Sequence, residues 1–283
     1  MAVDCRTPAN TAEKLSDSVC VNKVNAQPSK LIILGIFAGV FIGFGAQLAT
    51  VAGHDMSTYL GVGFSKLVMG AVFSVGLMLV VIAGAELFTG NNLVVLSALD
   101  KRISWGKVFS HWGIVFAANF IGSILLVYMI FFSGLWKTSS YHVGAFALKI
   151  ANGKVNLSFM EAFTRAILCN WLVCLAVWMA FASRYVIGKI FAILFPVMAF
   201  VASGYEHSIA NIFFIVKGIL LKSQPEVVAA SGLSADQLGN LNWSGFIFRN
   251  LIPVTIGNII GGAFFVAFLY WMVYLKPQKS NSK

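Results

Sequence analysis

The sequence predicts an all-α integral membrane protein with six transmembrane helices in an inverted 3+3 repeat, two of them broken near the middle of the bilayer. The chain has 283 residues, of which 59% are hydrophobic and only 11% are charged. Its mean hydropathy of +0.84 is too high for a water-soluble surface. A spanning helix needs about 20 apolar residues, and six apolar runs approach or exceed that length: residues 31–53, 67–99, 112–136, 166–183, 190–216 and 250–275.

Three regions are expected along the chain. Residues 1–29 are polar and form a cytoplasmic N-terminal arm or short amphipathic helix, residues 30–275 form the transmembrane domain, and residues 276–283 form a basic cytoplasmic tail. The net charge of +10 could suggest a nucleic-acid partner, but the basic residues stand singly at the ends of the apolar runs. The positive-inside rule expects them there and favours an orientation with both termini inside, so no nucleic-acid binding is predicted.

The first apolar run carries glycines at positions 35, 39, 43 and 45, a small-residue face that allows another helix to approach closely. The second run, residues 67–99, is too long for one straight span, and Gly84 and Gly90 favour a non-helical turn inside it. A polar connection at residues 223–242 is expected to hold a short surface helix.

Two of the apolar runs contain the same interruption: glycine, any residue, glutamate, four residues, asparagine. It occurs from Gly84 through Glu86 to Asn91, and again from Gly204 through Glu206 to Asn211. Ionisable groups at membrane depth are costly and usually face a protein interior or a pore. The third and sixth runs also share an Asn-x-x-Gly tetrad, at residues 119–122 and 258–261. Three spans per unit force the two units into opposite orientations, with a site near the midplane; a chance recurrence of short motifs is the alternative.

The interruptions also suggest a chemistry. A helix that unwinds in the membrane must find partners for its freed backbone groups, so Glu86 and Glu206 are expected to hold the turns by accepting hydrogen bonds rather than to contact an anion. His207 is the titratable group at mid-membrane depth expected to face a substrate, where it can share a proton with an arriving anion. A structural hydrogen bond is the alternative role for this histidine. Thr89 in the opposing break can supply a hydroxyl to the same place.

Hydrophobic side chains near the breaks are candidates for dry constrictions. Broken half-helices can point their positive N-terminal ends inward, which favours a small anion. Packing alone is the competing explanation for the constriction candidates, which are Phe73, Leu77, Leu87, Phe88 and Phe200.

Two other classes of membrane protein are ranked low. A membrane redox enzyme would need clustered histidines or cysteines, but the four cysteines and four histidines lack metal-ligand spacing, so no metal, cofactor or enzymatic activity is predicted. A neutral-solute channel of the aquaporin type would use paired Asn-Pro-Ala turns, and the sequence contains none.

Four stretches resemble the signature blocks of the formate/nitrite transporter family: residues 84–90, 170–179, 202–211 and 250–258. The likeness extends over essentially residues 20–275. It implies an aquaporin-like fold assembled as a homopentamer, with one pore per protomer, in a bacterial-type inner membrane.

The resemblance also implies roles for particular residues. His207, Thr89, Asn170 and Asn211 would surround the central site. Phe73 and Leu77 match one constriction, whereas Phe200 and Leu87 contribute to gating the other. Two lysines would concentrate anions electrostatically at the mouths, Lys154 in the outer vestibule and Lys23 in the inner one.

Formate is the first expected substrate, because residues 250–258 look most like formate channels. Glu86 and Gly90, where formate members often carry aspartate and serine, look more like nitrite or hydrosulfide members, which come second; acetate and lactate belong to the same class of small monovalent anions. A charged anion crossing two dry constrictions is costly, so transient protonation with His207 as relay is the expected mechanism. The sequence is compatible with channel-like or carrier-like transport, with either direction, and with or without gating by the N-terminal arm.

Overall fold

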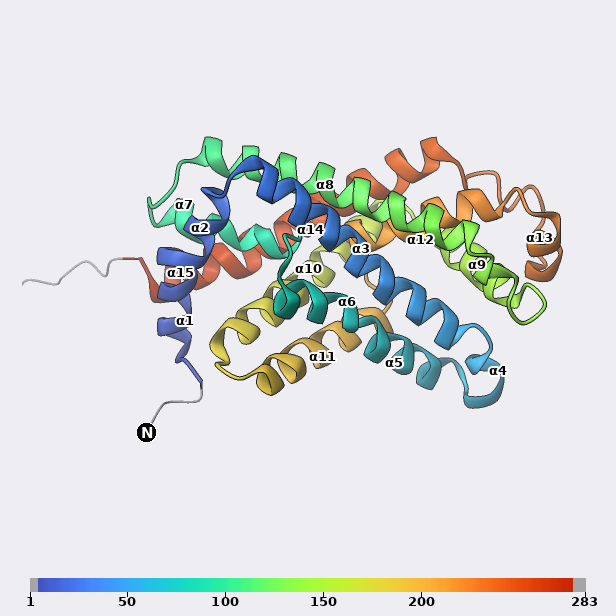
Figure 1. Cartoon of the computed structure of the whole chain (residues 1–283), viewed down its shortest axis with the longest axis horizontal. Coiled ribbons are helices and arrows are strands. Elements are labelled where there is room, and N and C mark those ends of the chain that lie inside the picture. Colours follow the sequence, from blue (N-terminus) through green and yellow to red (C-terminus); the bar gives the residue numbers. More distant parts are fainter. Residues whose placement is uncertain (1–4, 277–283) are drawn as a thin grey trace, which may run out of the picture.

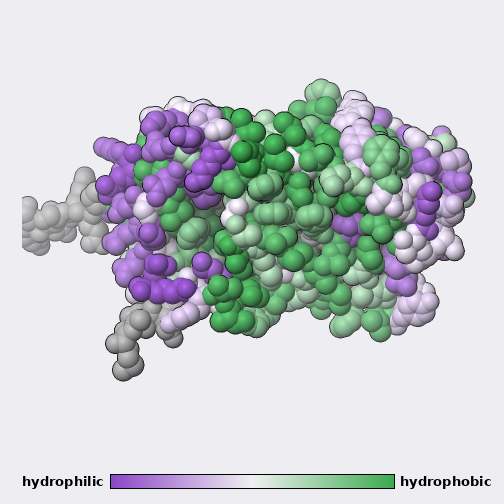
Figure 2. All heavy atoms as spheres, viewed as in Figure 1, coloured by the Kyte–Doolittle hydropathy of each residue, from purple (hydrophilic) through white to green (hydrophobic). Residues whose placement is uncertain are grey.

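The computed structural model describes residues 5–276 as an elongated helical bundle (Figure 1). Figure 2 shows an apolar band around the middle of the visible face, between two hydrophilic ends. Such a band is the surface that a protein presents to lipid. Apart from Lys276, the expected tail at residues 276–283 lies outside the described residues.

Within residues 5–276, five helices are long and apolar enough to cross a membrane. They are α3 (Pro28–Gly53), the continuous helix Val62–Gly84, α8 (Trp105–Phe132), α10 (Phe159–Ala182) and the continuous helix Gly245–Tyr274. Three further apolar helices are shorter: Gly90–Leu99, α11 (Val186–Ala202) and α12 (Ser208–Leu221). The fifth expected span, residues 190–216, is not among the five long helices because its break divides it into α11 and α12.

Several of these helices contain irregular turns. Helix Val62–Gly84 comprises α5 (Val62–Phe73), α6 (Val75–Met78) and a π-helical segment, Leu79–Gly84. After the first break come a 3₁₀ turn, Gly90–Val94, and α7 (Val95–Leu99). The last helix contains α14 (Ile252–Ile259) and α15 (Leu269–Tyr274), which alternate with the π-helical segments Gly245–Leu251 and Ile260–Phe268.

Close packing between α3 and α8 explains why the first span carries a face of small residues. A Cβ added to Gly39 would overlap the carbonyl oxygen of Asn119, and one added to Gly122 would overlap that of Ile36. The two backbones therefore approach each other through glycine faces, as in other membrane helix pairs.

The N-terminal arm is helical and docked against one end of the bundle, beside α15 (Figure 1). It consists of α1 (Pro8–Lys14), a π-helical turn (Leu15–Val19) and α2 (Cys20–Val24). Arg6 anchors it by donating from Nη1 to the carbonyl oxygen of Phe181 at 2.6 Å. Ser97 adds a second tie by donating its hydroxyl to the carbonyl oxygen of Ser16 at 2.7 Å.

The opposite end of the bundle carries short helices between the long ones (Figure 1). These are α4 (Met56–Leu60), a 3₁₀ turn (Leu135–Lys137), α9 (His142–Val155) and α13 (Pro225–Ser231). The last of these is the surface helix expected within residues 223–242. The end of α9 delivers Lys154 to the second break.

Candidate functional site

Both expected interruptions are present as breaks in the helices. The first lies between Gly84 and the 3₁₀ turn at Gly90, and the second lies between the end of α11 and Ser208. Gly84 has φ +93° and Gly204 has φ +74°, a region that residues with a side chain rarely adopt. Gly90 differs from the expectation: it lies in the 3₁₀ turn without a positive φ, and a Cβ added there would make only an ordinary contact of 3.5 Å with Val177.

Asn119 of α8 holds the first break. Its Nδ2 donates to the carbonyl oxygens of Gly35 and Glu86, both at 2.8 Å, and its Oδ1 accepts the backbone N–H of Phe88 at 2.9 Å. One fully buried amide thus satisfies two of the backbone groups freed by unwinding the helix.

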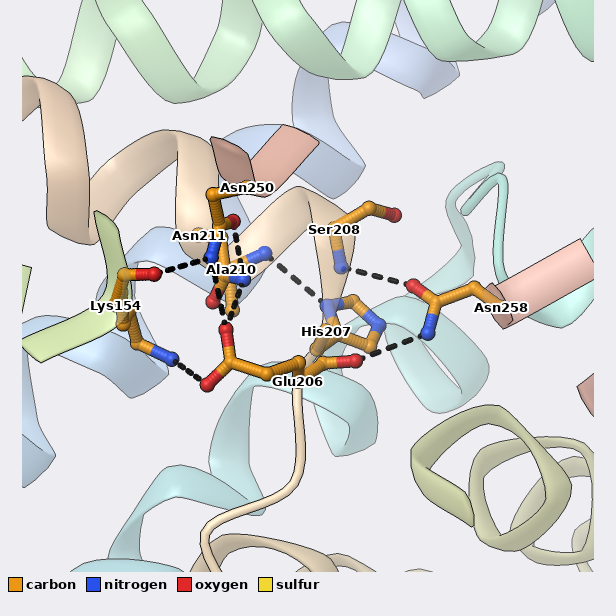
Figure 3. A network of polar contacts seen from close by, with 8 residues as sticks. All are labelled: Lys154, Glu206, His207, Ser208, Ala210, Asn211, Asn250 and Asn258. Atoms are coloured by element: carbon orange, nitrogen blue, oxygen red, sulfur yellow. Dashed lines mark hydrogen bonds and ion pairs between the residues drawn. The ribbon is translucent and has the colours of Figure 1, made fainter. Parts of the chain in front are cut away.

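Asn258 of the last helix holds the second break in the same way. Its Nδ2 donates to the carbonyl oxygens of Ala166 at 2.8 Å and Glu206 at 2.9 Å, and its Oδ1 accepts the backbone N–H of Ser208 at 2.9 Å (Figure 3). The two asparagines therefore form equivalent staples, each joining a break to a neighbouring helix.

The two glutamates occupy matching environments. Glu86 Oε2 accepts from Asn91 Nδ2 at 2.8 Å and from Lys23 Nζ at 2.7 Å. In the second break, Glu206 Oε2 accepts from Asn211 Nδ2 at 2.6 Å, and its Oε1 accepts from Lys154 Nζ at 2.9 Å (Figure 3). Both carboxylates are thus tied to side-chain donors at the breaks, in the arrangement expected of an architectural role.

The ion pairs modify the expectation for the vestibule lysines. Lys23 and Lys154 are partly buried, with side-chain exposures of 23% and 15%, and each forms an ion pair with a glutamate. Each of the two cavities is therefore lined by a pair of opposite charges rather than a free cation, and such a pair attracts distant anions more weakly than an unpaired lysine.

The two breaks meet at Thr89 and His207. Thr89 Oγ1 lies 2.8 Å from His207 Nε2, and both side chains are buried. The backbone N–H of Ala210 donates to His207 Nδ1 at 3.1 Å, so the imidazole caps the N-terminus of α12. A nitrogen that accepts this bond carries no hydrogen, which assigns the hydrogen of the neutral ring to Nε2, facing the Thr89 hydroxyl. Thr89 then keeps its own hydrogen for another acceptor.

Asn170 and Asn211 take part in this region without touching the imidazole. Asn170 Nδ2 donates to the carbonyl oxygens of Thr89 at 3.2 Å and Asn258 at 2.7 Å, so it fixes the backbone behind the threonine. Asn211 instead lies on the Glu206 side, where its Nδ2 also donates to Asn250 Oδ1 at 2.8 Å.

Cavities approach the breaks from both ends of the bundle. One of about 390 Å³ lies under the N-terminal arm and is lined in part by Lys23, Glu86, Leu77 and Leu87. One of about 150 Å³ at the opposite end is lined in part by Phe73, Phe200, Lys154, Glu206 and His207. Between them is a void of only about 10 Å³, close to the smallest space that holds one water.

The cavity linings pair the constriction residues differently from the expectation. Leu77 and Leu87 line both the arm-side cavity and the central void, whereas Phe73 and Phe200 line both the void and the opposite cavity. The phenylalanine rings meet edge to face with centroids 5.9 Å apart. Phe73 and Leu77, four residues apart and thus one turn apart on their helix, both line the central void, so their expected role as one constriction stays a prediction.

Phe88 is not part of either pair. Its ring packs edge to face against Trp112 and Phe116 of α8, with centroid separations of 6.2 and 5.0 Å. The chain alternates through the break, so Leu87 faces the cavities and Phe88 faces the neighbouring helix. The expected role of Phe88 as a constriction stays a prediction, and this packing does not support it.

Some site residues were missed in the sequence. In the sequence, Asn119 and Asn258 were recognised only as part of a repeated tetrad. Their recurrence was nevertheless the signal that both hold a helix break by hydrogen bonds. Ile42, Val173 and Val197 line the central void, but nothing distinguishes them in the sequence from other aliphatic residues of a membrane helix.

Comparison with known proteins identifies the family of this chain. A family model described as formate/nitrite transporter matches residues 9–272. A "Probable formate transporter" of Methanothermobacter thermautotrophicus is 44% identical over 98% of this chain and 100% of its own length. "Formate channel FocA" of Escherichia coli (strain K12) is 41% identical over 96% of each chain. A solved structure entitled "Pentameric formate channel with formate bound" superposes with a TM-score of 0.81 at 39% identity, covering 88% of this chain and 98% of that one. The resemblance seen in the sequence is confirmed, and the chain belongs to the formate/nitrite transporter family.

Proposed function

We propose that this protein transports small monovalent anions across a membrane, with formate as the principal substrate and nitrite or hydrosulfide as the alternatives. The names of its relatives support formate: two that match nearly the full chain are a probable formate transporter and a formate channel. Transport requires no chemical conversion of the anion, so the proposal assigns no enzymatic activity.

The observation that carries this proposal is the contact of Thr89 with His207 beside the two pairs of hydrophobic side chains. The leucine pair lines the arm-side cavity and the central void, whereas His207 lines the void and the opposite cavity together with Phe73 and Phe200. An anion entering the site exchanges its hydration shell for the Thr89 hydroxyl, whose hydrogen is not needed by the imidazole. Because the central void is only about 10 Å³, conduction requires the constriction side chains to move.

The geometry restricts how His207 takes part in proton coupling. In the imidazolium form both ring nitrogens carry hydrogens, so a hydrogen on Nδ1 would oppose the N–H of Ala210, which now donates to that atom at 3.1 Å. We infer that protonation of His207 is coupled to a rotation of the ring or a shift of the second break. The proposed relay is therefore a coupled movement rather than a proton transfer through a rigid site.

We further propose the finer architecture that the sequence predicts. The equivalent asparagine staples and glutamate clusters support an inverted 3+3 repeat of six spans, with the two breaks in spans two and five. The pentameric structural relative supports a homopentamer with one pore in each protomer. The arm at residues 1–29 and the tail at 276–283 are placed on the cytoplasmic side of a bacterial-type inner membrane, which makes Lys23 the inner and Lys154 the outer vestibule lysine.

The test measures uptake of labelled formate, nitrite and hydrosulfide into proteoliposomes at two external pH values. We expect formate to be taken up fastest, and more rapidly when the outside is acidic. His207→Phe is expected to abolish the proton-coupled part of the uptake, whereas His142→Phe, which alters an exposed histidine on α9, is expected to behave as wild type.

Two outcomes would contradict the proposal. Wild-type pH dependence in His207→Phe would refute the role of His207 while leaving anion transport intact. Equal failure of all three anions to enter in wild-type vesicles would refute the transport function itself.

A further inference from the structure

A further cavity, with a mixed polar and apolar lining, lies where the N-terminal arm, the start of α3 and α8 come together. Its volume is about 270 Å³, and its lining includes Asn25, Pro28, Lys107, Ser110 and His111. It is separate from the arm-side cavity that leads to the Thr89–His207 contact, because the two linings share no residue. Its function is not explained by the conduction path.

His111 lines this cavity and holds a buried ring nitrogen that lacks a partner in the described part of the chain. The residue is 2% exposed, and its Nδ1 has no hydrogen-bond partner among residues 5–276. The amide of Asn91 determines which ring nitrogen holds the hydrogen. Asn91 Nδ2 donates both to Glu86 Oε2 at 2.8 Å and to His111 Nε2 at 3.0 Å.

The glutamate requires a donor, so it fixes the orientation of the Asn91 amide, and the amide makes Nε2 of His111 an acceptor. The hydrogen of the neutral ring is then on Nδ1. A buried N–H without an acceptor is costly. We therefore expect an oxygen atom on the side of the ring away from Asn91, where it would accept the hydrogen bond from Nδ1–H.

The remaining polar groups of the cavity favour an anion as the source of that oxygen. Lys107 Nζ donates to Asn25 Oδ1 at 2.6 Å, which leaves further ammonium hydrogens for a ligand. α3 starts at Pro28 without a side-chain cap from Gln27 in the described part of the chain, so the positive end of its dipole adjoins the cavity. None of the described residues that line the cavity is a carboxylate.

The surroundings place this cavity at the border of the apolar band. Trp105 and Phe109, on the same turns of α8 as Lys107, are 46% and 62% exposed. Aromatic residues concentrate where lipid headgroups begin. A tetrahedral oxyanion suits the available volume, with Lys107 and His111 one turn apart on α8 and the N-terminus of α3 as a further positive group.

We propose that this cavity is a phosphate-binding site, in which Lys107 and the Nδ1–H of His111 are the principal donors. The phosphate belongs either to the headgroup of an anionic phospholipid or to a free ion. Because the site includes Asn25 of the arm and is linked through His111 and Asn91 to Glu86, an occupied site stabilises the docked arm and the first break together.

The test uses the purified, delipidated full-length protein with two probes. Inorganic phosphate is titrated in a thermal-shift experiment, and phosphatidylglycerol or phosphatidylcholine is added in detergent and counted by native mass spectrometry. The variants are Lys107→Gln and His111→Asn, with Lys189→Gln at the start of α11 as a matched control.

Asparagine is a conservative choice at position 111. His111 lies eight residues before Asn119, and Asn250 lies eight residues before Asn258, so the two positions are equivalent in the two breaks. In the second break, Asn250 accepts a hydrogen bond from Asn211, the equivalent of Asn91, at 2.8 Å. The substitution therefore keeps a partner for Asn91 and removes only the imidazole donor from the cavity.

We expect saturable binding of one phosphate group per chain. Each of the two variants should weaken it by about tenfold or more, the value of one hydrogen bond to a charged group, and Lys189→Gln should bind as wild type. Preference for phosphatidylglycerol without binding of inorganic phosphate would identify a lipid site, and the reverse would identify a site for a soluble ion. The proposal is overturned if neither probe binds saturably, or if binding survives both variants, or if Lys189→Gln weakens it as much as they do.

Discussion

Replacing Asn258 by leucine tests whether the second break depends on a single side chain. The substitution keeps the approximate size of the side chain but removes three hydrogen bonds, those with Ala166, Glu206 and Ser208. The backbone groups that lose their partner are buried in the bundle and have no water to replace it. We expect the break to loosen before the surrounding helices separate.

The size of the effect follows from the number of bonds. Hydrogen bonds between membrane helices average about 0.6 kcal/mol and reach about 1.7 kcal/mol in double-mutant cycles. Three of them give an expected loss of about 2 to 5 kcal/mol in the free energy of unfolding. Asn156→Leu, at the exposed end of α9, removes side-chain hydrogen bonds with Asn152 and Asn240, but water can replace the lost partner there, so it should cost no more than about 1 kcal/mol.

The assay combines unfolding by sodium dodecyl sulfate in mixed micelles with formate uptake by the same variants. A third variant, Asn258→Asp, keeps the acceptor for the Ser208 N–H but replaces the two amide donations by an oxygen facing two carbonyl oxygens. It should therefore be no more stable than the leucine variant. If Asn258→Leu unfolds at the same denaturant level as Asn156→Leu and transports normally, the staple contributes nothing and the reasoning about both breaks is refuted.

Three further predictions concern the docked arm, the ion pair of Lys154 with Glu206, and the Thr89 hydroxyl. Burial raises the pKa of Cys20 to about 12, so its thiol stays protonated at neutral pH. In a Cys5→Ser background, Cys20 should therefore resist labelling by maleimide until the arm undocks. Rapid labelling of the folded protein, measured by mass spectrometry, would show that the arm is not docked. Lys154→Gln leaves the Glu206 carboxylate without its cation and should slow formate uptake by roughly tenfold at low salt, with a smaller effect at about 0.5 M salt because of screening. An effect independent of salt would contradict the electrostatic explanation. Thr89→Val should reduce uptake by about tenfold or more while Thr89→Ser retains it, since only the hydroxyl is needed; equal rates for the two variants would exclude that role.

Much of the frame of this site could be predicted from the sequence, because it is encoded in local signals. The glycines at the breaks, a glutamate at membrane depth and a recurring asparagine spacing can all be read directly from the sequence. These signals predict the positions of both breaks and identify Glu86, Glu206 and His207 as candidate site residues.

The pairings across the passage could not be predicted in the same way. Whether Leu77 faces Leu87 or Phe73 depends on the relative depth of two helices, which no spacing within one helix determines. The ion pairs of Lys23 and Lys154 depend on where the arm and α9 dock. A single sequence shows that lysines are present, but it does not show that a carboxylate neutralises each of them.

The two breaks share one backbone design but differ in what it presents to the passage. The staples accept the N–H of Phe88 in one break and of Ser208 in the other, so these residues occupy equivalent positions, and the residues immediately before them do so too. That preceding position holds Leu87 in the first break and His207 in the second. The same backbone position therefore supplies an apolar barrier from one half and a polar group from the other. This difference explains how two similar breaks present unlike side chains: the repeated glycines, glutamates and asparagines specify the backbone of each break, and the residue after each glutamate specifies its chemistry.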